Sequence, residues 1–107
     1  MTNLSFECKL CDKNVEKESF NHTFGICNNC QTVMGLKVEA WEELIPKYQK
    51  KANSATDPDE KIINLSRMLD ILYECKIKYV DNGINAIDGD IDDMIEEVID
   101  CISYARL

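Results

Sequence analysis

The sequence lacks long apolar runs, a leader-like N-terminus and every common catalytic motif. Its longest apolar runs are three or four residues, and a transmembrane helix needs roughly 20. The opening segment MTNLSFECKL has no basic region followed by an apolar one, so we expect no signal peptide. There is no P-loop, dinucleotide fingerprint, His-Glu-x-x-His or nucleophile elbow. We therefore expect a cytoplasmic protein that is not an enzyme and has no catalytic residues.

Basic residues are scarce in the second half of the chain. The net charge is −8, and residues 1–52 balance seven acids with seven lysines. Residues 53–107 carry thirteen acids and five bases, and the segment 81–100 carries eight acids without a lysine or arginine. Such a surface repels phosphate backbones. It favours a protein partner with a basic surface over nucleic acid.

What the chain does have is two cysteine pairs near its N-terminus. Cys8 and Cys11 are separated by two residues, as are Cys27 and Cys30, and fifteen residues lie between the pairs. Two residues between cysteines let one tight turn direct both sulfurs at a single ion, and two such turns complete a tetrahedron with Zn–S distances of ~2.3 Å. A shell of four thiolates leaves no position for a water molecule, so the pattern predicts one structural Zn²⁺.

Two other interpretations of these cysteines remain open. A rubredoxin-like iron centre also uses four thiolates, but such sites usually place glycine after each pair, where this chain has Asp12 and Gln31. Disulfides require an oxidising compartment that nothing in the sequence indicates.

The fold class expected is mainly α, with a small four-cysteine zinc finger followed by a small helical bundle. The finger is of the treble-clef or zinc-knuckle type with a minimal β-hairpin between Val15 and Gly25, because the residues after Cys30 look helical. The predicted domains and helices are a zinc-finger module at 1–37 and an acidic helical domain at 38–107, with helices at about 38–50, 58–81 and 91–105.

The helix limits come from capping signals and apolar spacing. Asp57-Pro58 starts the second helix and Asn82-Gly83 stops it, and Asp90 precedes the third. Asn28 is a competent N-cap for an earlier helix that Gly35 could end or bend, and Pro46 should kink or end the helix that contains Trp41.

Several other residues invite functional interpretations that we weigh lower. His22, the only histidine, is best explained as a polar turn residue. Cys75 and Cys101 lie at inward positions of helices and are expected to be small buried hydrophobes. The acidic segment 88–93 fails the EF-hand template. Trp41 and Tyr48, close to basic residues 47–51, are more typical of a core than of a base-stacking platform.

The metal module resembles a known family. Cys8-Lys-Leu-Cys11 followed by Asp12, and Gly25-Ile26 before Cys27-Asn-Asn-Cys30, are similar to the Gin family of small zinc-binding anti-sigma proteins from endospore-forming bacteria. The resemblance covers residues 6–37 and implies metal-ligand roles for the four cysteines. We carry over only those roles, because the acidic helical remainder has no counterpart in that family.

These observations lead to one main hypothesis and two alternatives. The main one is a zinc-containing protein-interaction module, a bacterial or phage regulator that inhibits a transcription or DNA-binding protein. The first alternative is a zinc-dependent nucleic-acid binder that uses the N-terminal lysines Lys9, Lys13, Lys17 and Lys37 and the stretch 47–51. The second is an acidic imitation of DNA. A homodimer through the Leu65/Leu69/Leu72 stripe is also compatible with the pattern.

Overall fold

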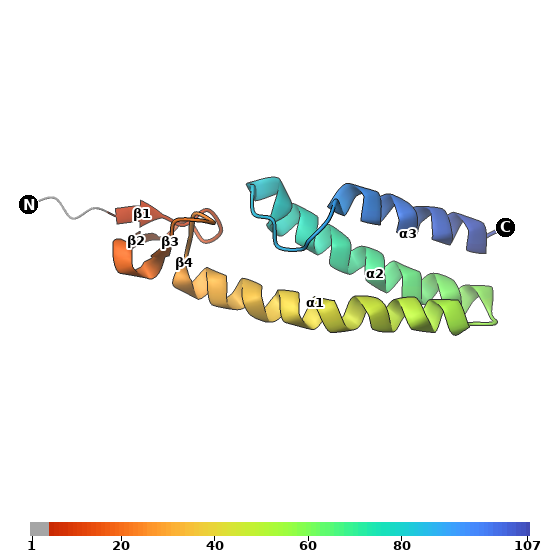
Figure 1. Cartoon of the computed structure of the whole chain (residues 1–107). Helices are drawn as coiled ribbons and strands as arrows, with labels where there is room; N and C mark the ends of the chain where they lie inside the picture. Colours follow the sequence, from red (N-terminus) through yellow and green to blue (C-terminus); the bar gives the residue numbers. More distant parts are fainter. Residues whose placement is uncertain (1–4) are drawn as a thin grey trace, which may run out of the picture.

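The computed structural model describes residues 5–107 as an elongated, mainly helical molecule. Its principal extents are 66 × 20 × 19 Å. Two small β-hairpins lie at one end, and three helices extend away from them (Figure 1). This arrangement confirms the predicted fold class, a small cysteine-rich finger followed by a helical bundle.

The finger contains two hairpins, where the sequence predicted one. Strand β1 (Ser5–Glu7) pairs antiparallel with β2 (Asn14–Glu16), and β3 (Phe20–Asn21) pairs antiparallel with β4 (Ile26–Cys27). A 3₁₀ turn, η1 (Lys17–Ser19), joins the hairpins. The predicted turn at residues 21–22 lies in the second hairpin, where the Asn21 side chain accepts the N–H groups of Thr23 and Phe24 at 2.9 and 3.1 Å.

Helix α1 (Asn28–Ser54) is continuous, which corrects three predictions. It begins ten residues before the predicted helix at 38–50, its N-cap is Cys27 rather than Asn28, and it ends at neither Gly35 nor Pro46. Gly35 and Pro46 are both exposed, so the carbonyl that loses its partner at Pro46 can be hydrated. Packing against a second helix along α1 supplies the stability that local propensity lacks. The predicted domain boundary at residue 37 falls inside this helix.

Helix α2 (Pro58–Lys78) follows a short turn and runs antiparallel to α1. Asp57 is its N-cap, as predicted, with its carboxylate accepting the Asp59 N–H at 3.0 Å, and Pro58 occupies the first turn. The helix ends earlier than the predicted residue 81, because a 3₁₀ turn, η2 (Val80–Asn82), replaces its last turn. Gly83 then reverses the chain with a left-handed φ of 78°.

Helix α3 (Ile91–Ala105) has the limits that the sequence predicted. The Asp90 carboxylate caps it by accepting the N–H groups of Asp92 and Asp93 at 3.0 and 3.3 Å. Asp90 therefore serves as a helix cap, in agreement with the interpretation that we preferred over a calcium loop.

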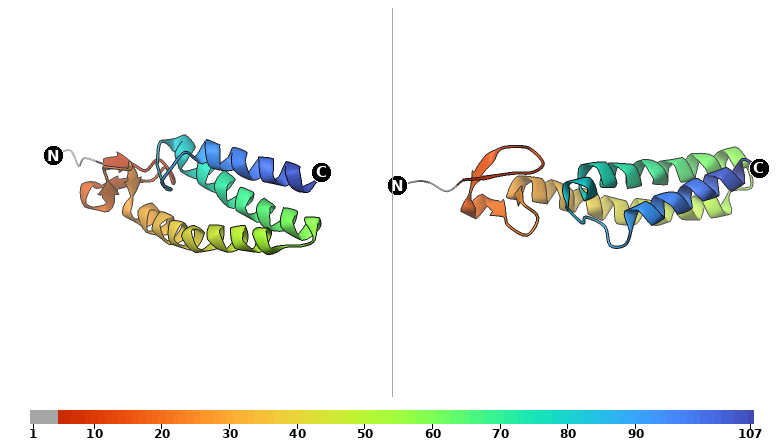
Figure 2. Two further views of the ribbon diagram at one scale, coloured as in Figure 1. Left: turned by 45° about the vertical axis from the view of Figure 1, so that its right-hand side comes forward. Right: turned by 90° about the horizontal axis from the view of Figure 1, so that it is seen from above.

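The helices share one apolar core that reaches the finger. Helix α2 lies between α1 and α3 and packs on both (Figures 1 and 2). The Trp41 ring on α1 meets the ring of Tyr79, the residue after α2, edge-on, with 6.0 Å between the ring centroids. The buried core comprises Cys8, Ile26, Cys27, Met34, Trp41, Ala52, Leu65, Met68, Leu72, Cys75, Tyr79, Ile84, Ile91, Ile95, Val98 and Ile102. Because Cys8 and Cys27 belong to it, the finger and the bundle are one packed unit.

The apolar residues of the helices bear on dimerisation and on membrane crossing. Leu65 and Leu72 are almost fully buried within the chain, so most of the leucine stripe is used inside the monomer. In the part of the chain that the structure describes, no helix has both the length and the apolar character that a membrane crossing requires.

Candidate metal centre

The first cysteine pair lies in the turn between β1 and β2. The Cys8 N–H donates to the Lys13 carbonyl at 2.9 Å, and the Asp12 N–H donates to the Cys8 carbonyl at 2.9 Å. Asp12 has a φ of 61°, the left-handed conformation that glycine adopts most easily and that Asp tolerates. Asp12 therefore adopts the backbone conformation that a glycine would supply after this pair, so the absence of glycine here does not separate zinc from iron.

The second cysteine pair lies where β4 passes into α1. Cys27 is the N-cap of α1, and its sulfur accepts the Cys30 N–H at 3.4 Å. Cys30 is therefore held in the first turn of the helix. A pair at the first turn of a helix is the treble-clef arrangement that the sequence predicted.

Backbone hydrogen bonds hold the two pairs together. The Lys9 N–H, inside the first pair, donates to the Gly25 carbonyl at 3.1 Å, and the Gly25 N–H donates to the Asn21 carbonyl at 2.8 Å. Gly25 has a φ of 73°, and a Cβ there would lie 2.7 Å from Cε of Lys9. Glycine is favoured at this position by the left-handed backbone conformation, whereas the Lys9 side chain is flexible and could move away from a Cβ.

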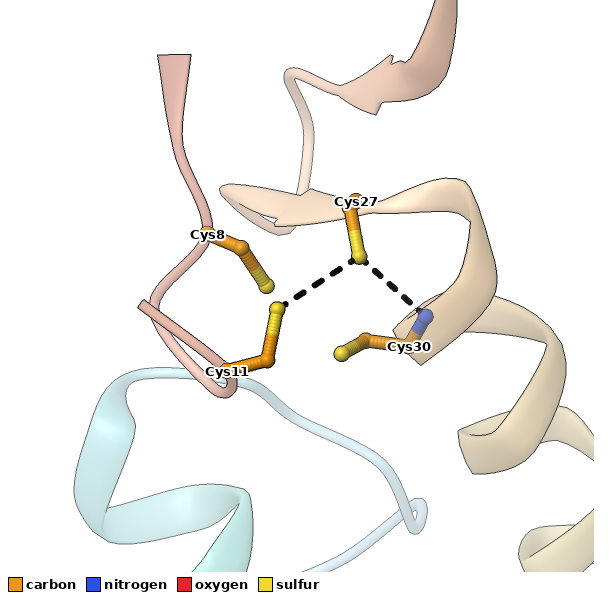
Figure 3. Close-up of side chains that lie close together, drawn as sticks. All are labelled: Cys8, Cys11, Cys27 and Cys30. Atoms are coloured by element: carbon orange, nitrogen blue, oxygen red, sulfur yellow. Dashed lines mark hydrogen bonds between the residues drawn. The ribbon is translucent and has the colours of Figure 1, made fainter. Parts of the chain in front are cut away.

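The four sulfurs converge on one point, as Figure 3 shows. All four lie within 4.8 Å of one another, and the sulfurs of Cys11 and Cys27 are 3.8 Å apart. A tetrahedral ion with Zn–S bonds of ~2.3 Å places its sulfur ligands ~3.8 Å from each other. The donor set therefore fits a single thiophilic ion, and the structure brings together all four predicted site residues.

The pKa values of the cysteines show why four sulfurs this close together favour a bound cation. Burial raises the pKa of Cys8, but backbone N–H groups of Cys27, Cys11 and Leu10 outweigh it and lower the pKa from 9.0 to about 6. Burial raises the pKa of Cys30, and the neighbouring sulfurs raise it further. One thiolate therefore forms easily and suppresses ionisation of its neighbours, and a bound dication removes this repulsion.

Cys11 is the most open member of the cluster. The Lys13 N–H lowers its pKa, whereas burial and the Cys8 sulfur raise it, and the net direction is upward. Its side chain is exposed, whereas Cys8 and Cys27 are buried. Cys11 is therefore the ligand that solvent and chelators reach first.

His22 lies outside the cluster. Its ring is exposed and meets the rings of Phe6 and Phe20 edge-on, with centroids 4.8 and 5.0 Å away. The rings of Phe6 and Phe20 are themselves stacked at 5.0 Å. This small aromatic cluster ties the first hairpin to the second, and it was not foreseen from the sequence because Phe6 and Phe20 come from strands too short to show a periodic pattern.

The remaining cysteines differ from each other. Cys75 is buried as predicted, and burial raises the pKa of its thiol, which makes it a poor nucleophile. Cys101 is exposed, so its predicted inward position is wrong. Helix α3 packs mainly on α2, so its buried stripe is narrow and does not include Cys101. The buried residues of α3 are Ile91, Ile95, Val98 and Ile102.

Trp41 and Tyr48 take the core role that we favoured. Trp41 is buried, and Tyr48 is half-buried beneath the guanidinium of Arg67, which lies 5.7 Å from the centre of its ring. Neither ring is open for stacking on a nucleic-acid base.

The chain was compared with models of known protein families, with curated proteins and with solved structures, and none of the three comparisons found a match.

Proposed function

We propose that the finger binds one structural zinc ion and that the protein is a non-enzymatic protein-interaction module. The observation that carries the proposal is the convergence of four sulfurs within 4.8 Å, with Cys27 and Cys30 fixed by the start of α1. A shell of four thiolates is complete, so the ion has no open position at which a substrate or water could react. Its role is to hold two short hairpins against the helix.

Zinc is the ion that we assign to this shell. Both zinc and iron accept four thiolates in a tetrahedron, and the backbone turn at Asp12 suits either. Zinc has no redox chemistry, and no second cofactor or electron-transfer partner is implied by the chain. A protein purified without added metal should be colourless and contain one zinc per chain, whereas an iron centre would colour it.

The partner that we propose is another protein with a basic surface. The supporting observation is the charge of residues 53–107, which carry thirteen acids and five bases. Opposite charge steers association and selects partners. DNA-binding proteins and components of transcription have the required basic surfaces, so we place the protein among regulators that occupy such a surface, in a bacterium or its phage.

The test is capture of the partner by the metal-loaded protein at moderate salt. A recovered protein should bind the purified chain in a defined ratio, and its affinity should fall as salt rises. Repeated capture without any protein partner would count against the proposal. A gel shift at low salt provides the second arm, because phosphate contacts are strongest there. A clear shift would favour nucleic acid instead.

A further inference from the structure

A groove between α1 and α3 has the features of a docking site for a helix. Both helices pack on α2 but scarcely touch each other, and the space between them holds a hollow of about 340 Å³. Its floor is formed by Leu65 and Met68 of α2 and Val98 of α3, which are exposed by only 3, 4 and 6% and therefore offer little surface to a ligand. The accessible apolar surface of the groove belongs mainly to Tyr104 on its rim. The hollow therefore lies where α1 and α3 flank α2, and Figure 1 shows α2 between these two helices.

The rim of this groove combines apolar and acidic groups. Tyr104 of α3 lies at its edge with 77% of its surface exposed, and Glu97 and Asp100 lie beside it. Gln49 of α1 forms the opposite wall. Of the described residues that line the groove, none is a lysine or arginine.

The acidic edge continues along α3. Asp93, Glu97 and Asp100 are spaced by four and three residues, which places them on one side of the helix. No lysine or arginine occurs within α3. The ion pairs found within residues 5–107 join Lys37 to Glu74 and Lys76 to Asp81 and Asp92, so neither Glu97 nor Asp100 is neutralised by a pair in this part of the chain.

We propose that this groove binds an amphipathic helix of another protein, with apolar residues on the face that enters and lysine or arginine along its edge. A helix laid between α1 and α3 completes a four-helix arrangement, in which its apolar face packs on the exposed Tyr104 and Cys101 above the floor. Unpaired carboxylates on the rim select a basic edge. A second copy of this chain is disfavoured, because each copy carries a net charge of −8. The inference rests on the proposed function and locates its binding surface.

The probe is a labelled synthetic peptide of leucine and lysine in amphipathic helical order. Its control has the same composition in scrambled order, which keeps the charge and removes the apolar face. Binding to the full-length, metal-loaded protein is followed by fluorescence anisotropy. The amphipathic order should bind about tenfold more tightly or better, because only it can present several leucines together to Tyr104 and the hollow beside it. Equal affinity for both peptides would overturn the proposal.

Matched charge reversals separate the groove from the net charge. Glu97→Lys with Asp100→Lys changes the rim, whereas Glu43→Lys with Asp70→Lys changes exposed acids that do not line the groove, by the same total charge. The first pair should weaken peptide binding about tenfold, and the second by less than about threefold, because only long-range attraction is lost there. Equal losses would show that the peptide responds to net charge alone.

Cys101 reports directly on the groove. It lines the hollow and is exposed, whereas Cys75 is buried and the other four cysteines form the metal cluster. A thiol reagent should modify Cys101 of the metal-loaded protein, and saturating peptide should slow this reaction about tenfold by covering the sulfur. Unchanged modification while the peptide is bound would place the peptide elsewhere and overturn the proposal.

Two outcomes distinguish this inference from the proposed function. If a captured partner binds the Glu97→Lys/Asp100→Lys variant as tightly as the unaltered protein, the groove assignment fails and the interaction module stands. If no partner is captured at all, the proposed function fails. Concentration-dependent dimerisation that this variant abolishes would instead show that a second copy occupies the groove, which would also overturn the assignment.

Discussion

The two ends of this molecule are stabilised in different ways. The head, residues 5–27, has strands of two or three residues, and its buried apolar residues are Cys8, Ile26 and Cys27. The body, helices α1–α3, buries side chains from all three helices around Trp41 and Tyr79. A segment as small as the head excludes little apolar surface of its own, so we expect a metal ion bound by the four cysteines to add to what its contact with the core supplies. The body needs no such ion.

The two ends are nevertheless coupled through α1. The same helix supplies Cys30 to the metal cluster and Trp41 to the core, one near its start and one near its middle. Figure 3 shows the chain that follows α2 passing beside Cys11 and Cys30. Loss of the metal should therefore loosen the first turns of α1 as well as the hairpins, and leave the rest of the body folded.

The largest expected difference between the head and the body should follow from the loss of one metal ligand. Cys30→Ser removes a thiolate, and the metal affinity should fall by more than the ~10–100-fold that losing an outer-shell partner costs. Metal content and hydrogen exchange of the head measure the result. The matched control is Cys101→Ser, at an exposed cysteine outside the cluster, which should keep its metal. Full metal content in Cys30→Ser would remove that cysteine from the ligand set.

The converse change destabilises the body and spares the metal site. Trp41→Ala opens a cavity where α1 meets Tyr79 and should lower the free energy of unfolding by about 3–5 kcal/mol. Leu36→Ala, on the same helix at a side chain with 63% exposure, should change it by less than about 0.5 kcal/mol. Denaturant unfolding of the metal-loaded proteins gives both values. An equal loss of unfolding free energy in the two variants would contradict the placement of Trp41 in the core.

Acid should release the metal from the head before it unfolds the body. Protons on Cys11 and Cys30, whose pKa values are raised, must leave when the metal binds, so affinity should increase with pH. The pKa of Cys8 is lowered to about 6, so below that pH one more proton competes and the dependence should steepen. Competition with a coloured chelator across pH measures this slope. An affinity that does not change with pH would argue against thiolate ligands.

The smallest effect concerns the part of α1 that joins the two ends. Gly35 is an interior helix residue, and a Cβ built there has no atom within 4 Å. Gly35→Ala should therefore raise the free energy of unfolding by up to about 1 kcal/mol, because alanine loses less backbone entropy in a helix. Thermal unfolding of the metal-loaded protein detects the shift. A destabilised variant would mean that α1 needs the flexibility of Gly35 at this point.

Helix limits that are set by neighbouring residues could be predicted from the sequence, whereas limits that depend on packing between helices could not. Helices α2 and α3 were predictable because Asp57 and Asp90 cap them through hydrogen bonds to residues two or three positions away. Helix α1 was not, because Gly35 and Pro46 are local breakers that packing on α2 overrides. Residue patterns cannot weigh such a long-range contribution.

The metal cluster likewise has features that the sequence predicted and features that it did not. The spacing of Cys8, Cys11, Cys27 and Cys30 was sufficient to predict that their sulfurs meet, because two tight turns fix each pair. The hairpin that carries the first pair was missed, because strands of three residues show no alternation. The left-handed conformation of Asp12 was missed too, since Asp adopts it only where the surrounding turn demands it.

We propose that a metal ion stabilises the head and that an apolar core stabilises the body. The sharpest test combines metal analysis with hydrogen exchange before and after chelation. The protein is purified without added metal. We expect one zinc per chain, and fast exchange after chelation only in residues 5–27 and the first turns of α1, with α2 and α3 still protected. Iron in place of zinc would contradict the metal assignment, and a head that stays protected after the metal is removed would show that the metal does not hold it.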